Sequence, residues 1–414
     1  MSVKLSALLR RCTVFAAALS ATAIFASAAM AQATDPVVVT FSTVGDSRQD
    51  PTTANLSAQD AIWLQNTKAF SRILRSIQSQ RANLLFFNGD MIMGYGKANA
   101  PTASNPTVDQ IVAGDLLKFY QQYGFWRGMV STVMETGTYV VPVPGNHEVQ
   151  CKSCLIGVGA KTAVVENENA WRANMGDLIV SAARFQDLFG EQPTNLNVSD
   201  NGGLDGLTTD QSKLSYSFDF RRNHFVVINT DPVGKDAQAP TKWLSDDLSK
   251  AKIRGVRNFF VFGHKPAFTY YFITNPPTAN DKPSGLDNQP YNLPLPGGKK
   301  VNAVNFDPSL RDAFWDVIEQ YGAYYFCGHE HVYDVRKPRE ATGGRSWHVI
   351  VGGGGSPFDA PAGGTLNPAT DRAYSWATLK IHASGIVDLD TYGFSDGYGP
   401  TFLIKAVHSI PAAN

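Results

Sequence analysis

The sequence predicts an α/β fold, in which β-strands and helices alternate through most of the chain. Short apolar runs of the length of buried strands recur between longer segments whose apolar residues repeat at helical spacing. Five of the apolar runs are followed closely by a glycine and then by Asp, Asn or His. This pattern places polar side chains at the carboxyl ends of strands, where open α/β sheets bind their ligands.

The amino-terminal part of the chain alternates predicted strands with predicted helices. Apolar residues at helical spacing indicate one helix between the first two strands, and a second helix leads into the third strand. In chain order, these elements are the strand Val37–Phe41, the helix Ile62–Gln80, the strand Leu84–Phe87, a helix over about Val108–Thr132 and the strand Tyr139–Val143.

The remainder of the chain begins with a predicted insertion, residues 151–213, which has helices near 166–174 and 180–189. A β-hairpin follows, because Leu214–Phe220 alternates with a strand period and Asn223–Asn229 comes after a short turn. The later elements are a helix over Thr241–Lys252 capped by Thr241, the strand Asn258–Val261, a long loop over 270–306, the helix Pro308–Tyr321, the strand Ala323–Cys327, and an antiparallel pair formed by Trp376–Ile381 and Ile386–Tyr392.

The first 31 residues have the pattern of a secretory signal peptide. A basic start that includes Lys4 precedes the small apolar run Val14–Ala29, and Ala29-Met30-Ala31 resembles a cleavage site. The alternative is a membrane anchor, but the run is shorter than the roughly 20 residues that a span needs. We therefore expect a secreted or periplasmic protein, with a mature domain over 32–414 and no contact with the membrane after cleavage.

Charge argues against a nucleic-acid or anionic-membrane partner. The whole chain has 36 Lys and Arg and 36 Asp and Glu. The leader holds three basic and no acidic residues, so the mature chain has 33 basic against 36 acidic residues, a net charge of −3. Such a balance gives no basic footprint. The remaining length fits one large domain or two, and the apolar content is ample for a core.

Three cysteines follow the leader. In an exported protein, Cys151 and Cys154 can close a small disulfide loop. A redox Cys-x-x-Cys pair is the alternative, but that motif normally opens a helix after a strand. The count excludes a site of four zinc-binding thiolates. Cys327 is most simply a buried strand residue.

Five polar motifs follow the predicted strands in this order: Gly45-Asp46, Gly89-Asp90, Gly145-Asn146-His147-Glu148, Gly263-His264 and Gly328-His329-Glu330-His331. One motif alone would be weak evidence, but the ordered set resembles the calcineurin-like metallophosphoesterase superfamily. Other segments are similar to its purple-acid-phosphatase-like members, so that the resemblance extends from about residue 37 to 393: Tyr216–Asp219, His224–Val227, Lys242–Leu248 and Gly352–Gly355.

The resemblance implies a four-layer α/β-β/α sandwich, in which two packed mixed sheets are flanked by helices. It also implies a hydrolase of small-molecule phosphomonoesters or phosphodiesters, with in-line attack by a metal-bound hydroxide at a dinuclear centre. Two cations about 3.5–4 Å apart can generate such a nucleophile and neutralise phosphoryl charge. Carboxylate, amide and imidazole ligands suit Fe, Mn or Zn. By resemblance, Asp90 bridges two metals, Asp46 and His331 serve one, and Asn146, His264 and His329 serve the other.

The resemblance leaves His147 free of both metals, where it contacts phosphate or protonates the leaving oxygen. It makes Glu148 the partner that fixes the orientation of the His147 ring. Arg48 stands where much of the superfamily has a histidine ligand, and an arginine cannot deprotonate to replace it. Two interpretations of Arg48 are equally open: a bidentate grip on phosphate, or a salt bridge to Asp50 or another carboxylate.

Purple acid phosphatases compensate for the missing histidine with a tyrosine, but the corresponding residue here is Met93, and the nearest tyrosine is Tyr95. One metal therefore has three protein ligands, with water or Tyr95 completing its shell. This departure makes a second function credible, a phosphate- or ligand-binding protein on the same fold with an incomplete metal site and little turnover.

The remaining motifs have simpler interpretations. Gly352–Gly355 lacks the Lys-Ser/Thr ending of a nucleotide phosphate loop, so we expect it to let the backbone approach the site closely. Ser47 is interpreted as a loop-capping residue. Tyr270–Phe272 either line a pocket or pack the long loop. Four histidines are interpreted as structural: His224, His348, His382 and His408.

Overall fold

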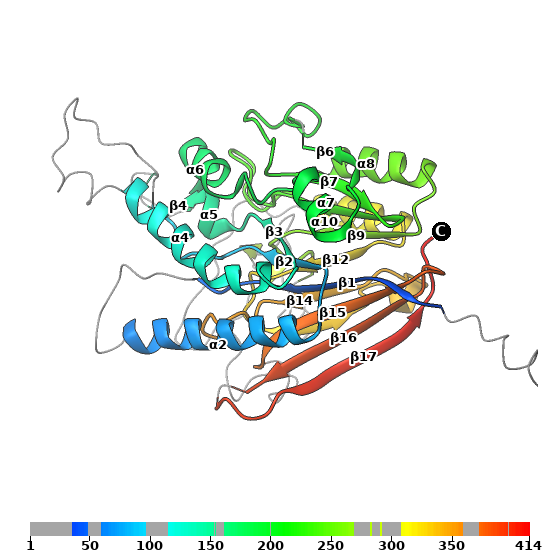
Figure 1. Ribbon diagram of the computed structural model, residues 1–414. Coiled ribbons are helices and arrows are strands. Elements are labelled where there is room, and N and C mark those ends of the chain that lie inside the picture. Colours follow the sequence, from blue (N-terminus) through cyan, green and yellow to red (C-terminus); the bar gives the residue numbers. More distant parts are fainter. Residues whose placement is uncertain are drawn as a thin grey trace, which may run out of the picture.

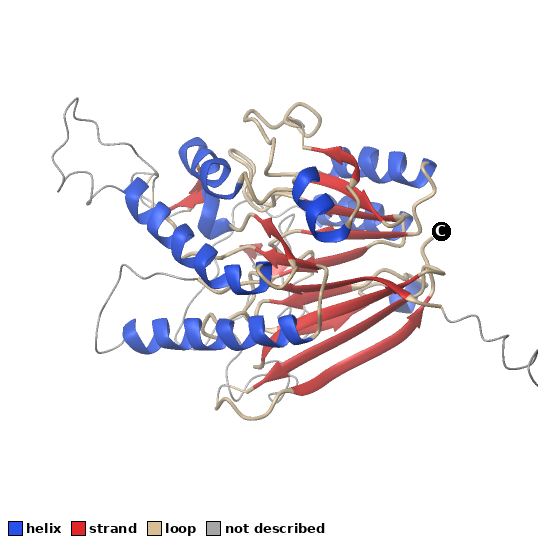
Figure 2. Ribbon diagram, viewed as in Figure 1, coloured by secondary structure: helices blue, strands red, loops and turns tan. Residues whose placement is uncertain are grey.

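A computed structural model describes residues 35–48, 59–96, 115–152, 154, 161–198, 200–268, 282–283, 290–291, 308–358, 372–395 and 397–414. Two large β-sheets stack face to face in the middle of the molecule, and helices cover their outer faces (Figures 1 and 2). This arrangement confirms the predicted four-layer α/β-β/α sandwich. The predicted signal peptide, Tyr270–Phe272 and nearly all of the loop over 270–306 lie outside the described residues.

The first sheet has six strands in the order β17-β16-β15-β1-β2-β3. The neighbours β1, β2 and β3 are parallel, whereas β15, β16 and β17 form an antiparallel extension beside β1. The bounds are β1 Val37–Val44, β2 Leu84–Asn88, β3 Tyr139–Val143, β15 Tyr374–His382, β16 Val387–Phe394 and β17 Phe402–Ile410.

The second sheet has seven strands in the order β13-β14-β12-β9-β8-β7-β6, of which β8, β9, β12 and β14 are parallel. Its bounds are β6 Thr194–Asn197, β7 Tyr216–Phe220, β8 Asn223–Val227, β9 Asn258–Phe262, β12 Tyr324–Cys327, β13 Tyr333–Arg336 and β14 His348–Val351. Two short pairs lie outside the large sheets: β4 Gln150–Cys151 with β5 Thr162–Ala163, and β10 Lys282–Pro283 with β11 Pro290–Tyr291.

Helices form the two outer layers. The helices α2, α4 and α6 pack in the apolar cluster outside the first sheet, and α8 and α10 pack in the cluster outside the second. The bounds are α2 Gln59–Ser79, α4 Asp115–Met134, α5 Asn146–Val149, α6 Val165–Met175, α7 Ala182–Phe189, α8 Thr241–Ile253, α10 Pro308–Gln320 and the 3₁₀ helix η2 Glu340–Thr342.

Strand residues alternate between two apolar layers, because successive side chains of a strand point to opposite faces. In β2, Leu84 and Phe86 enter the core between the sheets, whereas Leu85 and Phe87 face the outer helices. Phe86 stacks on Phe262 of the other sheet with ring centroids 3.7 Å apart. Burial on both faces explains why these strands are continuous apolar runs in the sequence.

The predicted cap of α8 is wrong. Thr241 is the first residue of the helix, and its hydroxyl donates to the carbonyl of Ala239. The amides of Lys242 and Trp243 instead donate to the carboxylate of Asp205, at 2.9 and 3.0 Å. A carboxylate from a distant loop thus satisfies the first turn of the helix, which no local pattern around Thr241 reveals.

His224 links β8 to its neighbours, which supports its structural interpretation. Its Nδ1 lies 2.5 Å from the Asp219 carboxylate and its Nε2 lies 2.8 Å from the Asp247 carboxylate. Burial lowers the pKa of His224, but the hydrogen bonds to Asp219 and Asp247 outweigh it and raise the pKa above its usual value. A pKa that is raised in the folded protein stabilises the fold below the unfolded value, and this contribution is lost as pH rises through the folded value.

We therefore expect His224→Gln to lower the free energy of unfolding by about 3 kcal/mol near pH 6 and by less near pH 9. Urea unfolding of both proteins at the two pH values measures this difference. His408→Gln is a matched control, because the His408 side chain is 56% exposed and pairs with Asp390 at the surface. An equal loss at both pH values would contradict a charged His224.

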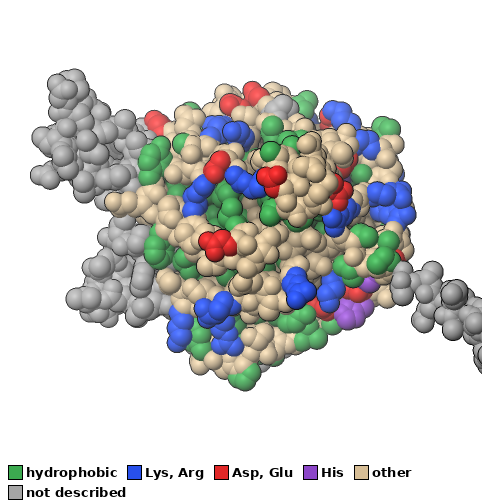
Figure 3. Space-filling view, viewed as in Figure 1, with side chains coloured by type: hydrophobic (Ala, Val, Ile, Leu, Met, Phe, Trp, Pro, Cys, Tyr) green, Lys and Arg blue, Asp and Glu red, His purple; other side chains and the backbone are tan. Residues whose placement is uncertain are grey.

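The surface of the protein carries both positive and negative side chains (Figure 3). On the face shown in Figure 3, Lys and Arg side chains form several small groups with Asp and Glu side chains among them. Among the described helices, none has the length and apolarity that crossing a membrane requires.

Candidate metal centre

The carboxyl ends of five strands, three from the first sheet and two from the second, bring buried polar side chains together. Asp46 follows β1, Asp90 follows β2 and Asn146 follows β3, while His264 follows β9 and His329 follows β12. Two groups of these side chains can each hold a metal ion, since their ligand atoms lie within 4.8 Å of one another. The groups are Asp90, His264 and His329, and Asp46, Asp90 and His331, so Asp90 belongs to both.

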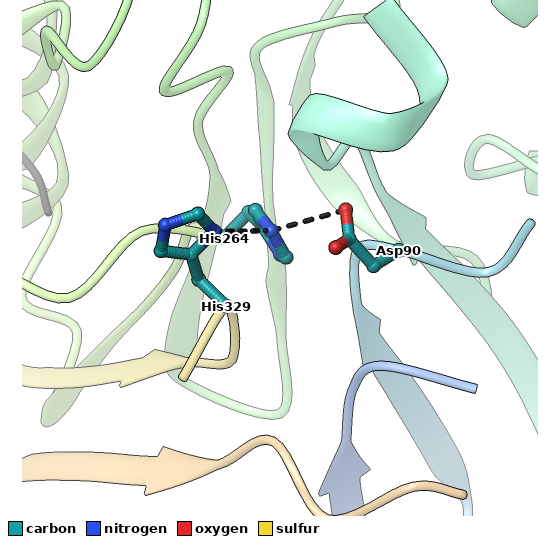
Figure 4. Close-up of side chains that lie close together, drawn as sticks. All are labelled: Asp90, His264 and His329. Atoms are coloured by element: carbon teal, nitrogen blue, oxygen red, sulfur yellow. Dashed lines mark hydrogen bonds and ion pairs between the residues drawn. The ribbon is translucent and has the colours of Figure 1, made fainter. Parts of the chain in front are cut away.

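The first group surrounds His264, which lies between Asp90 and His329 (Figure 4). His264 Nε2 is 3.1 Å from Asp90 Oδ1 and 3.3 Å from His329 Nδ1. Asn146 Oδ1 lies 2.8 Å from His264 Nε2 and 2.9 Å from His329 Nδ1. On its other side, His264 donates from Nδ1 to the Asn88 carbonyl at 2.7 Å, which turns Nε2 toward this cluster.

The second group connects Asp46 with His331. His331 Nε2 is 3.5 Å from Asp46 Oδ1, and His331 Nδ1 donates to the carbonyl of Pro357 at 2.6 Å. The Asp46 carboxylate also accepts the backbone N–H of His329 at 3.0 Å. His331, like His264, thus donates one ring N–H to a backbone carbonyl and turns its other ring nitrogen toward a carboxylate.

Glycines allow the strand ends to approach this closely. A Cβ on Gly145 would lie 2.6 Å from Asp90 Oδ1, and a Cβ on Gly328 would collide with Asp46 Oδ2. Three candidate ligands also have positive φ angles, 66° at Asp46, 53° at Asp90 and 70° at His329. Such conformations are uncommon for residues other than glycine, and they concentrate at functional sites.

Electrostatics distinguish the members of the first group. Burial raises the pKa of Asp90, but attraction by His147 and His264 outweighs it and holds the pKa well below its usual value. Burial lowers the pKa of His264, yet the Asp90 charge raises it to about 9. Burial, and then the charge of His264, hold the pKa of His329 well below its usual value.

These residues fit a bound cation. Asp90 is ionised, and His329 is neutral, as metal ligands must be. Because its pKa is raised, His264 carries a proton on each ring nitrogen. The Nδ1 proton is donated to the Asn88 carbonyl, so the additional proton lies on Nε2. That proton faces the oxygens of Asp90 and Asn146, so a metal ion at this point would replace it and meet the same oxygens.

The expectation that Glu148 orients His147 is wrong. Asn146–Val149 form a single helical turn, α5, in place of the expected loop, and this turn directs Glu148 back toward the backbone. Its carboxylate accepts the N–H groups of Gly145, Asp90, Met91 and Ile92 at 2.8–3.2 Å. Glu148 therefore holds the second and third strand ends together.

His147 is oriented by a backbone group. Its Nδ1 donates to the carbonyl of Met93 at 2.6 Å, and its Nε2 lies 3.5 Å from Asp90 Oδ2. The Tyr95 ring packs on the imidazole with centroids 3.7 Å apart. Burial, and then the charge of Arg48, hold the pKa of His147 well below its usual value.

Arg48 and Tyr95 contact two different candidate ligands, Asp90 and Asn146. Arg48 Nη2 is 3.4 Å from Asp90 Oδ2, so Asp90 is an ion-pair partner of Arg48, while Asp50 lies outside the described residues. The hydroxyl of Tyr95 accepts from Asn146 Nδ2, which places it beside the His264 and His329 group. Burial, and then the Asp90 charge, raise the pKa of Tyr95 well above its usual value. Of the two alternatives for completing the metal shell beside Asp46, water or Tyr95, the structure has the Tyr95 hydroxyl at Asn146 instead.

The glycine run Gly352–Gly355 approaches the site closely, as expected. Gly354 N donates to the Gly45 carbonyl at 2.9 Å, and Gly45 N donates to the Val351 carbonyl at 3.0 Å. A Cβ on Gly352 would lie 3.1 Å from Asp46 Oδ2. Ser47 donates to the Met91 carbonyl and thereby joins two of the site loops.

The cysteines and the remaining histidines have structural contacts. Cys151 and Cys154 form a disulfide, one of the two alternatives for this pair, and Cys327 is buried in β12, as predicted. His348 accepts the backbone N–H of Ala267 at 3.2 Å. His382 pairs with the Asp388 carboxylate and the exposed His408 with that of Asp390.

Several charged residues that lie beside the site were not identified as candidates from the sequence. Lys161 donates to the Tyr95 hydroxyl at 2.7 Å, and Lys265 pairs with Asp231 at 2.7 Å. Lys265 could have been suspected because it follows His264 directly. Lys161 and Asp231 belong to no recognisable motif, and folding alone brings them to the site.

The chain matches the family model of calcineurin-like phosphoesterases over residues 62–333, more than half of its length. The fold and this match define a hydrolase of phosphoester bonds. The protein belongs to the calcineurin-like phosphoesterase family. Membership implies a dinuclear metal site, and the two groups that share Asp90 are the candidates for it.

Solved structures with similar folds include three proteins. A purple acid phosphatase from yellow lupin (Lupinus luteus) seeds is 13% identical with a TM-score of 0.48, and the match covers 89% of this chain and 53% of that protein. This chain thus spans about half the length of the lupin protein. GAP50, the anchor in the inner membrane complex of Plasmodium, is 12% identical with a TM-score of 0.43, covering 91% of this chain and 90% of that one. A dimetal phosphatase from Danio rerio is 10% identical with a TM-score of 0.40, covering 89% and 99%. No curated protein matches the chain.

Proposed function

We propose that the protein is an exported phosphoesterase that depends on two metal ions, Fe, Mn or Zn, and hydrolyses small-molecule phosphomonoesters or phosphodiesters by in-line attack. The observation that carries this proposal is the position of Asp90, whose carboxylate belongs to both candidate ligand groups. The basic and apolar pattern of residues 1–31 supports export. The Cys151–Cys154 disulfide also fits an oxidising compartment.

We assign the proposed ligands to the two metals according to the distances between their ligand atoms. Asp90 bridges, and Asn146, His264 and His329 hold one metal through atoms that lie 2.8–3.3 Å apart. Asp46 and His331 hold the other. When bound, two such cations neutralise phosphoryl charge and lower the pKa of a water so that it can attack phosphorus.

His147 is proposed to act on the phosphoryl group without binding a metal. Its Nδ1 is engaged by the Met93 carbonyl, so Nε2 is the nitrogen that faces the site. The negative charge of a bound phosphoryl group raises the pKa of a neighbouring imidazole. His147 can then hold a proton on Nε2 and pass it to the leaving oxygen. Arg48, which pairs with the Asp90 carboxylate, is proposed to bind phosphate oxygens through its guanidinium.

We also propose one metallophosphoesterase domain over residues 32–414. The predicted insertion, residues 151–213, supports this because it contributes to the body of the fold. Its strand β6 pairs with β7 at the edge of the second sheet, and Trp171 of α6 is buried against the first.

A substrate panel with matched metal analysis tests the function. Protein loaded with Mn, Zn or Fe is expected to bind about two metals per chain and to cleave p-nitrophenyl phosphate, bis-p-nitrophenyl phosphate or both. Treatment with a chelator, followed by removal of the chelator, should abolish activity, and adding the metal back should restore it. Failure of every loaded form on both substrates would overturn the proposal. One metal or none, with ligand binding but no turnover, would indicate a binding protein with an incomplete site.

A further inference from the structure

Tyr95 connects the candidate metal ligands with two lysines. Its hydroxyl accepts from Asn146 Nδ2 and also from Lys161 Nζ, the latter at 2.7 Å. Its ring packs on His147 on the side of the centre. The Lys161 amine lies 4.2 Å from the centroid of the Tyr95 ring, and the Lys152 amine lies 4.6 Å from it.

The short hairpin β4–β5 fixes the position of both lysines. Lys152 directly follows β4, and its backbone N–H donates to the Tyr95 carbonyl at 3.0 Å. Lys161 directly precedes β5. Asp236 fastens the hairpin to the body of the protein, because its carboxylate accepts from Gln150 Nε2 and from the Ala163 amide at 3.1 and 3.0 Å. The backbone at both lysines is therefore held beside the centre, and their exposed side chains can reach a ligand there.

Positively charged side chains lie close to one another beside Tyr95. Arg48 reaches the same region from the first strand end, at Asp90. Desolvation of its amine, and then the charges of Lys152 and Arg48, lower the pKa of Lys161 to about 8. Among the described residues, no carboxylate lies within ion-pair distance of the Lys161 amine. The Asp90 carboxylate offsets part of this repulsion, and an anion bound between the two lysines would offset more of it.

We propose that Lys152 and Lys161, with Arg48, form a subsite that binds a second phosphate group carried by the leaving alcohol of the substrate. This inference rests on the proposed phosphoesterase function and names its substrate class, a phosphoester with a neighbouring second phosphate. The P–O bond to the leaving alcohol breaks, water supplies the oxygen on phosphorus, and the alcohol leaves with its own phosphate intact.

The geometry sets the distance between the two phosphates. A single hydroxyl, that of Tyr95, separates the Lys161 amine from the amide of Asn146. The second phosphate must therefore lie close to the first, as on adjacent carbons. A phosphate carries up to two charges and several acceptor oxygens, which two ammonium groups and a guanidinium can bind together.

The test compares ethane-1,2-diol bisphosphate with ethane-1,2-diol monophosphate, which differ only in the second phosphate. We expect the metal-loaded protein to have a kcat/KM at least about tenfold higher for the bisphosphate, as a charge-assisted contact implies. In the double variant Lys152→Gln, Lys161→Gln the ratio of the two values should fall to about one, and each single variant should lie between. The ratio is measured within one protein, so a general loss of activity cancels.

Lys250→Gln is the matched control, because Lys250 is an exposed lysine of α8 that pairs with Asp246, and its ratio should equal that of the unmodified protein. Lys161→Arg should retain the preference. A ratio near one in the unmodified protein, or a ratio unchanged in the double variant, would overturn the subsite and leave the phosphoesterase function standing. Absence of hydrolysis of both diol phosphates and of p-nitrophenyl phosphate would instead overturn the function itself.

Discussion

Replacing Asp90 with asparagine is expected to lower kcat/KM about 1,000-fold or more and to reduce the metal content below two per chain. The variant keeps the size of the side chain but removes the charge that both candidate ligand groups share. It also removes the ion pair with His264, at 3.1 Å, and the contact between the Asp90 carboxylate and Nε2 of the neutral His147, at 3.5 Å. Metal analysis and the kinetics of p-nitrophenyl phosphate hydrolysis on the same sample measure both effects.

Asp246→Asn is the control for Asp90→Asn, because the Asp246 side chain is 52% exposed on α8 and pairs only with a surface lysine in the described structure. It should leave metal content and rate unchanged. Circular dichroism establishes whether the Asp90 variant is folded. Normal hydrolysis by a folded Asp90→Asn protein would show that the bridging assignment is wrong.

His147→Asn is expected to lower kcat for an alkyl phosphate about 100- to 1,000-fold while two metals remain bound. Asparagine can still donate to the Met93 carbonyl, as His147 Nδ1 does, but it lacks the Nε2 atom that faces Asp90. Substrates with different leaving groups then distinguish the two roles open to His147, which are proton transfer to the leaving oxygen and contact with phosphate. Nitrophenolate leaves without a proton, so a proton donor matters much less for p-nitrophenyl phosphate than for an alkyl phosphate.

A small effect on p-nitrophenyl phosphate and a large effect on the alkyl phosphate would assign proton transfer to His147. Equal losses on the two substrates would assign a phosphate contact instead. Loss of a metal from His147→Asn would contradict both roles and make His147 a ligand. His408→Asn, at an exposed histidine, serves as the control and should leave all three measurements unchanged.

The fold was predictable because its central strands are buried on both faces. Runs such as Leu84–Phe87 have no polar positions, and the residue types that follow them are those that ligate metals. The candidate ligands Asp90, His264 and His329 were found for the same reason, since parallel strands in two stacked sheets end at one edge.

The interactions of Glu148 and Tyr95 depend on the direction in which each side chain points, which the sequence does not specify. Glu148 follows His147 in the chain, but a helical turn sends the two side chains to different partners. Tyr95 and Lys161 are 66 residues apart in the chain and meet through a hydrogen bond beside the β4–β5 pair. Such contacts join residues with no common motif, so only the structure reveals them.

The two sheets supply chemically different candidate ligands. The loops of the first sheet supply only oxygen ligands, Asp46, Asp90 and Asn146, and the loops of the second supply only imidazoles. A cation can therefore find its mixed ligand set only after the two sheets have docked. Ions that bind the native protein and not the unfolded chain shift the folding equilibrium toward the docked state. A metal ion bound by both sets of ligands would therefore hold the two sheets together, and its removal would weaken their packing.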